Sequence, residues 1–118
     1  MGNLNPKPVE IEFQGKMYRC VFTLNCIDEA QEHFDKSLTE IIEFAFSGST
    51  AVRNIRYLLT LLLNDSPDCE TELSEKEVGA AIDIRSFDYY CVKILEALGV
   101  SLPDDDGDDL PEVAAGQG

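Results

Sequence analysis

The sequence has no tryptophan, one histidine (His33) and four cysteines, none of them in a C-x-x-C pair. A structural zinc site needs clustered cysteine and histidine ligands, whereas these residues are scattered over separate predicted elements. We therefore expect no bound metal and no other cofactor. One histidine is enough for a catalytic triad, but no G-x-S-x-G nucleophile motif and no glycine-rich phosphate-binding motif accompanies it. We expect a protein that is not an enzyme and has no catalytic residues.

Positive charge is scarce, because nine Lys and Arg residues stand against 23 Asp and Glu residues and give a net charge of −14 at pH 7. Six of the acids lie in residues 101–118, which hold no basic residue. The remaining acids still outnumber the basic residues, so the body of the chain is acidic as well. Such a surface repels the phosphates of nucleic acids and of anionic membranes. We expect neither as a partner.

Long hydrophobic runs are absent too. The longest apolar run is far shorter than the ~20 residues that a membrane-spanning helix needs, and the first residues lack the apolar core of a signal peptide. Cysteines that stay unpaired are the rule in a reducing cytoplasm. We therefore expect a cytoplasmic protein with free thiols.

What the sequence does have is one strongly apolar stretch over residues 52–63. Its apolar residues recur with the three- and four-residue spacing of a buried helix face. They are Val52, Ile55, Leu58, Leu59, Leu62 and Leu63. Tyr57 and Leu61 widen that face, and each fully buried Leu or Ile contributes roughly 1.5–3 kcal/mol. We predict that this Leu-rich helix, from about residue 50 to 64, organises the core.

Residues 9–22 alternate apolar and polar on either side of a turn, which predicts a β-hairpin. A two-residue Gly15-Lys16 loop suits a type II′ turn and places Phe13 opposite Tyr18. A loop that begins one residue earlier would instead pair Phe13 with Lys16. We favour the first register because it keeps apolar residues opposite each other.

Helix boundaries are marked by capping signals. The helix after the hairpin begins near Thr23 or Asn25, and two capping boxes, at residues 37–40 and 74–77, start two more helices. The last helix begins at Asp83 or Ser86.

These elements predict a mainly α-helical fold with a small N-terminal β-hairpin, an α+β protein in which about five helices pack around the central Leu-rich helix. Residues 1–8 form a flexible N-terminus. Residues 9–102 form one globular domain, with the hairpin in 9–22 and the helices in 24–100. Residues 103–118 are predicted to be an acidic disordered tail.

Two acidic segments allow a second interpretation. Residues 104–109 superficially resemble a calcium-binding loop, but Leu102 stands where the first ligand would be, so a solvated tail is favoured. The acids between residues 65 and 77 either dock a basic segment or form a solvated loop that leads into a capping box.

Taken in order, four segments resemble the tail assembly chaperones of long-tailed bacteriophages and prophages. They are Y-R-C-V-F-T-L-N at 18–25, K-S-L-T-E-I-I at 36–42, L-S-E-K-E-V-G at 73–79 and E-A-L-G at 96–99. The similarity covers about residues 9–100 and rests on the order and spacing of these segments.

The resemblance implies a non-catalytic protein that binds the long, mostly helical tape measure protein, keeps it soluble and helps to recruit tail tube protein around it. Such proteins are often also made as a longer, frameshifted form, and residues 103–118 would then be the tail of the shorter form. No active-site residue transfers from the family.

An apolar surface is the feature that such a protein needs. We predict a groove between the central helix and the last helix, with Tyr57, Leu61, Phe87 and Tyr90 as candidate partner-binding residues. The alternative, that all four are ordinary core residues, stays open.

Two other functions compete with this interpretation. A virion structural or adaptor protein would be present in purified particles. An acidic inhibitor that mimics DNA would compete with DNA for a basic protein.

Overall fold

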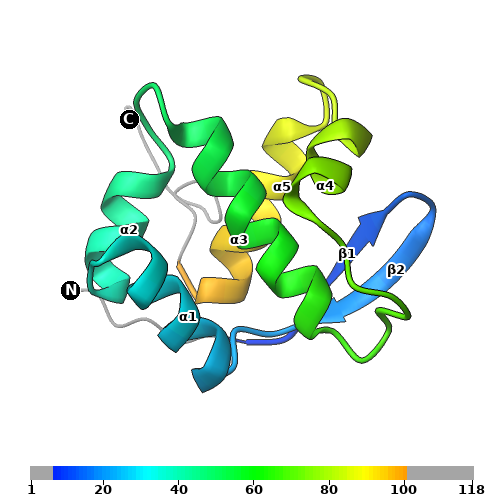
Figure 1. Ribbon diagram of the computed structural model, residues 1–118, viewed down its shortest axis with the longest axis horizontal. Helices are drawn as coiled ribbons and strands as arrows, with labels where there is room; N and C mark the ends of the chain where they lie inside the picture. The colour runs from blue at the N-terminus through cyan, green and yellow to red at the C-terminus, as the bar shows by residue number, and fades with distance from the viewer. Residues whose placement is uncertain (1–6, 101–118) are drawn as a thin grey trace, which may run out of the picture.

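The structure, a computed structural model, describes residues 7–100, which form five helices and one antiparallel hairpin (Figure 1). The elements are β1 (Val9–Phe13), β2 (Lys16–Cys20), α1 (Leu24–Phe34), α2 (Leu38–Ala45), α3 (Ala51–Asp65), α4 (Glu75–Ala81) and α5 (Phe87–Leu98). This arrangement confirms the predicted small α+β fold. The predicted tail, residues 103–118, and residues 1–6 of the predicted flexible N-terminus lie outside the described part of the chain.

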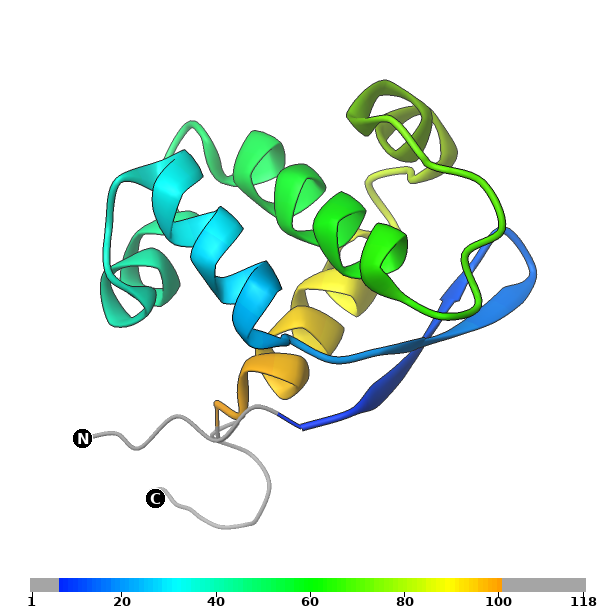
Figure 2. The same ribbon diagram turned by 60° about the horizontal axis from the view of Figure 1, so that its bottom comes forward.

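The Leu-rich helix α3 lies at the centre of the fold. The helices α1 and α2 cover one side of it and α4 the other, while α5 crosses behind it in Figure 1 and beneath it in Figure 2. The predicted face is buried at Ile55, Leu58, Leu59, Leu62 and Leu63. Val52 was expected on the same face, but 59% of its surface is exposed. That part of the prediction is wrong because the first turn of α3 borders an open groove.

The first two helices begin at side-chain caps. The Thr23 hydroxyl accepts a hydrogen bond from the Cys26 amide at 3.2 Å, so Thr23 is the cap and Asn25 lies inside α1. At α2 the Ser37 hydroxyl accepts from the Glu40 amide at 3.2 Å, and the Glu40 carboxylate accepts from the Ser37 amide at 2.9 Å. The predicted capping box is therefore present.

The same device starts α4, and a glycine ends α5. Ser74 and Glu77 exchange hydrogen bonds of 2.8 and 3.0 Å in a second capping box. Gly99 has a φ of 81° at the end of α5, a left-handed conformation in which a side chain would be strained. The start of α4 and the end of α5 therefore lie where local sequence chemistry places them.

The hairpin has a different register from the one we favoured. Phe13 pairs with Lys16 across a Gln14-Gly15 loop, whose φ angles of 53° and 76° are those of a type I′ turn. The twist of this turn matches the right-handed twist of paired strands. The Lys16 ammonium lies 3.7 Å from the Glu70 carboxylate, so its charge has a partner although Phe13 stands opposite.

The change of register moves each cross-strand partner by two residues and therefore preserves the apolar face. Ile11, Phe13, Tyr18 and Cys20 are all buried on that face, which packs against α5 and α3. A slip of one strand by a single residue would have turned the two buried apolar side chains of that strand to the opposite face.

An ion pair attaches β2 to the loop that follows α3. The Arg19 guanidinium donates to both carboxylate oxygens of Asp68 at 2.9 Å, and the Arg19 amide donates to the same carboxylate at 2.9 Å. These hydrogen bonds lower the pKa of Asp68 to about 2.

Candidate partner-binding groove

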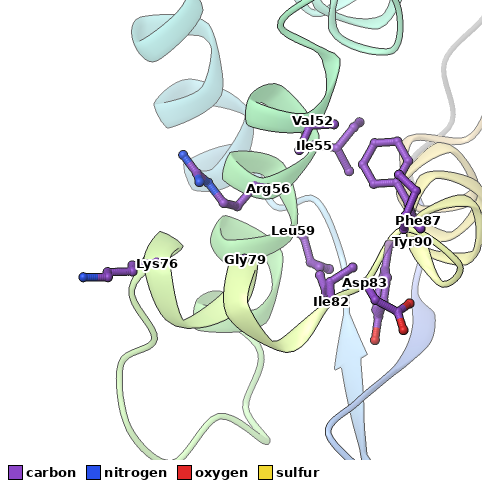
Figure 3. A pocket seen from close by; sticks show the side chains of 11 residues that line it. Val52, Ile55, Arg56, Leu59, Lys76, Gly79, Ile82, Asp83, Phe87 and Tyr90 are labelled. Carbon is purple, nitrogen blue, oxygen red and sulfur yellow. The ribbon is translucent and has the colours of Figure 1, made fainter.

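A groove of about 330 Å³ opens between α3, α4 and the beginning of α5 (Figure 3). Its lining is mostly apolar and comes from all three helices and from the turn between α4 and α5. The lining residues are Val52, Ile55, Arg56, Leu59, Lys76, Gly79, Ile82, Asp83, Ile84, Phe87 and Tyr90. The groove therefore lies at the interface that we predicted between the central and last helices, with α4 as a third wall.

Exposure divides the apolar lining into a floor and a rim. Ile55 and Leu59 form the floor and are almost completely buried, whereas Val52 and Ile84 at the rim are 59% and 80% exposed. Singly exposed apolar residues are common on protein surfaces, but a contiguous apolar patch around a hollow is typical of a binding site. A ligand in this groove would cover both rim residues.

The α5 wall is held in place by the hairpin. Tyr90 lines the groove, and its hydroxyl donates a hydrogen bond of 2.9 Å to the Glu12 carbonyl. The neighbouring Tyr89 hydroxyl accepts from the Glu12 amide at 3.0 Å. Burial raises the pKa of Tyr90, so this phenol stays neutral and keeps its hydrogen bond. Tyr90 is thus a fixed wall rather than a mobile one.

The α4 wall lies close to α3 because Gly79 has no side chain. A Cβ atom at this position would lie 3.0 Å from Cδ of Arg56, closer than ordinary contacts allow. The Arg56 Nε atom is buried and has no hydrogen-bond partner among residues 7–100, and the nearest carboxylate oxygen, on Glu75, is 3.7 Å away. Arg56 therefore packs its aliphatic stem between the two helices.

The turn between α4 and α5 is stabilised by Asp83. Its carboxylate accepts hydrogen bonds from the Ser86 amide at 3.0 Å and the Arg85 amide at 3.1 Å. These hydrogen bonds, of which the one from the Ser86 amide has the largest effect, hold the pKa of Asp83 below its usual value. This turn places Ile84 at the rim of the groove. The Asp83 carboxylate is hydrogen-bonded by the amides of the turn itself.

The structure separates the four predicted partner-binding residues into two pairs. Phe87 and Tyr90 line the groove from the α5 side, and the close-up shows the Phe87 ring opposite Ile55 and Tyr90 near Ile82 (Figure 3). Tyr57 and Leu61 do not line it, although both lie on α3.

Tyr57 belongs instead to the contact between α3 and α1. Its ring stacks on His33 with the ring centroids 3.7 Å apart and the planes 8° from parallel. Its hydroxyl donates to the Glu29 carbonyl at 3.3 Å. Leu61 is partly buried and packs against the core.

Sequence reasoning did not identify Val52, Ile82 or Ile84 as groove residues. For Ile84 a signal was available, because this large apolar residue stands between Asp83 and Arg85 in a turn, where no helix face buries it. For Val52 the periodicity pointed to the core.

The groove holds no obvious reactive group. Elsewhere in the chain, burial raises the pKa of Cys20 to about 12 and that of Cys91 to about 11, so neither thiol is a thiolate at neutral pH. Among residues 7–100 no three His, Cys, Asp or Glu side chains gather in a way that could hold a metal ion. None of the helices described is both long and apolar enough to cross a membrane.

Comparisons of the chain with protein-family models, with curated proteins and with solved structures gave no match.

Proposed function

We propose that this protein is a tail assembly chaperone of a long-tailed bacteriophage or prophage, which binds the tape measure protein and keeps it soluble until tail tube protein assembles around it. The proposal is supported by the resemblance over residues 9–100 and by the groove between α3, α4 and α5. The groove is the observation that carries it.

The shape and chemistry of the groove suit an amphipathic helix. Such helices bind by placing apolar side chains, spaced at three and four residues, into a hydrophobic groove. A volume of about 330 Å³ accepts a few such side chains. The rest of the helix would then lie along the exposed rim formed by Val52 and Ile84. This mode needs no catalytic group.

The charge of the chain suits a protein that keeps another one soluble. A net charge of −14 on 118 residues produces repulsion between complexes. An apolar client bound to such a carrier would be less prone to aggregate than the free client. The carrier itself stays dispersed for the same reason.

Co-expression with the candidate tape measure protein tests the proposal. We expect the tape measure protein to accumulate in the soluble fraction with this chain and to precipitate without it, and we expect the two to elute together in size-exclusion chromatography. If neither a complex nor improved solubility is observed, the proposal is wrong.

The two competing functions predict different results in simple assays. A virion structural or adaptor protein would be found by mass spectrometry in purified particles, at a constant ratio to the tail subunits. A DNA mimic would release DNA from a basic protein in a competition assay. The chaperone proposal predicts neither result.

A further inference from the structure

A second hollow, of about 250 Å³, lies between the hairpin turn and the beginning of α5. Its lining residues are Glu12, Gln14, Gly15, Ser86, Tyr89 and Tyr90. Tyr90 also lines the groove between α3, α4 and α5, so the two hollows adjoin at this side chain. A ligand that fills the groove can therefore extend past Tyr90 into the second hollow.

The second hollow is lined by one carboxylate, that of Glu12. The amide and the carbonyl of Glu12 are hydrogen-bonded to the Tyr89 and Tyr90 hydroxyls, and its exposed side chain takes no part in these bonds. Within residues 7–100 no nitrogen of a Lys, Arg or His side chain lies within 4 Å of the Glu12 carboxylate. The negative charge of Glu12 is therefore available to a ligand.

The basic side chains around the two hollows do not offset this charge. Lys76 lines the groove but points away from it in Figure 3. The others each have a carboxylate within 4 Å: Lys16 pairs with Glu70, Arg56 with Glu75, Arg85 with Asp83 and Lys93 with Glu96. Because the chain as a whole also has a net charge of −14, the second hollow attracts a cation.

We propose that the groove binds a basic amphipathic helix. Its apolar side chains fill the groove, and a Lys or Arg one helical turn farther along, about 5.4 Å, enters the second hollow and pairs with the Glu12 carboxylate. This inference rests on the proposed function, because it states which helices of the client protein the groove takes. The aliphatic stem of the basic side chain packs against the half-exposed Tyr89 ring, while the charged head stays near water.

The same arrangement disfavours an acidic helix. A carboxylate in the second hollow would face Glu12 with no cation between them, and like charges at an interface suppress binding of the wrong partner. The pair of hollows thus distinguishes helices of equal hydrophobicity by the sign of the charge beside their apolar face.

Binding of two model peptides to the full chain tests this inference. Both are fluorescein-labelled amphipathic helices with leucines at three- and four-residue spacing. One carries a lysine one turn before the first leucine and another one turn after the last, and its companion carries glutamine at both positions. Fluorescence anisotropy at low salt measures the two affinities. We expect the lysine peptide to bind about three- to fivefold more tightly, as expected for one exposed ion pair.

Two variants of β1 separate a specific ion pair from general attraction to an acidic protein. Glu12→Gln should weaken binding of the lysine peptide about three- to fivefold and leave that of the glutamine peptide unchanged. The backbone bonds of residue 12 to the two tyrosines do not depend on the carboxylate. Glu10→Gln removes the same charge from the same face of β1, at an exposed residue that lines neither hollow. It should leave both affinities unchanged.

A variant of the groove itself completes the test. Ile84→Glu places a charge at the exposed rim and should weaken binding of both peptides, since both use the groove for their leucines. If the chain alone is a dimer that Ile84→Glu converts to a monomer, a second copy occupies the groove and the proposal is wrong.

Three further outcomes would overturn the proposal: equal affinities of the two peptides for the wild type, equal losses in Glu12→Gln and Glu10→Gln, or no binding of either peptide. These measurements contain no client protein. Equal affinities would therefore leave the proposed chaperone function standing, and a failed co-expression test would leave the preference between the two peptides unchanged.

Discussion

The Tyr90 hydroxyl donates a hydrogen bond of 2.9 Å to the Glu12 carbonyl, and this bond joins the last helix to the first strand. Because Tyr90 also lines the groove, the same side chain fixes the hairpin and one wall of the candidate site. The position of the groove thus depends on the contact between two distant parts of the chain.

Tyr90→Phe should lower the free energy of unfolding by about 1–2 kcal/mol, because it removes this bond and leaves the Glu12 carbonyl without its donor. Urea denaturation followed by circular dichroism measures the change. Tyr18→Phe is the matched control: Tyr18 is also 8% exposed, but its hydroxyl has no hydrogen bond to any described residue. Equal losses in the two variants would show that the bond is not what stabilises the contact.

Leu59→Asp should abolish folding. Leu59 is completely buried at the centre of α3, and an unpaired charge there costs several kcal/mol, a large part of the total stability of a small domain. Val52→Asp, on the same helix but 59% exposed, should keep the wild-type circular dichroism spectrum. A folded, fully helical Leu59→Asp protein would contradict the central place of α3 in the core.

The Arg19–Asp68 pair should make stability depend on pH below neutrality. The folded-state pKa of Asp68 is lowered from 3.8 to about 2, so the pair stabilises the fold above pH 3.8 and loses its effect as the pH falls through about 2. Asp68→Asn should therefore be less stable than the wild type at pH 7, and the difference should shrink between pH 4 and pH 2.

Urea midpoints across this pH range measure the effect of Asp68. Glu70→Gln is the control, because Glu70 makes only an exposed pair at 3.7 Å with Lys16 and such pairs contribute little. A difference between wild type and Asp68→Asn that does not change with pH would mean that the carboxylate acts through packing and not through its charge.

Ser74→Ala should loosen α4 in particular. The Ser74 hydroxyl caps this seven-residue helix, and loss of such a cap costs about 1 kcal/mol. Amide hydrogen exchange should become faster in α4 and remain unchanged in α2, which has its own cap. Ser49→Ala, at an exposed serine that caps no helix, should leave both helices unchanged.

Most of the helical framework was predictable because its signals are local. Both capping boxes lie where the serine and glutamate spacing predicts them, and Gly99 ends α5 as expected. The buried face of α3 followed from periodicity, since leucines at three- and four-residue spacing leave few alternatives.

The errors arose where the answer depends on a neighbouring element. The hairpin register depends on a non-glycine residue, Gln14, that adopts a φ of 53° and on a partner for Lys16 that comes from the loop after α3. The exposure of Val52 depends on how far the neighbouring helices α4 and α5 extend along α3. Tyr57 has the same apolar character as a groove residue, but the ring of His33 stacks on it. Periodicity shows which face of a helix is apolar and not which neighbour covers it.

The binding of a tape measure fragment to the groove is tested most directly by its affinity for two matched variants, measured by isothermal titration calorimetry. Ile84→Glu should weaken binding at least about tenfold, or about 1.4 kcal/mol, whereas Leu24→Glu, with the same added charge on α1 and outside the groove lining, should bind like the wild type. Equal affinities of all three proteins would show that the fragment does not bind in the groove.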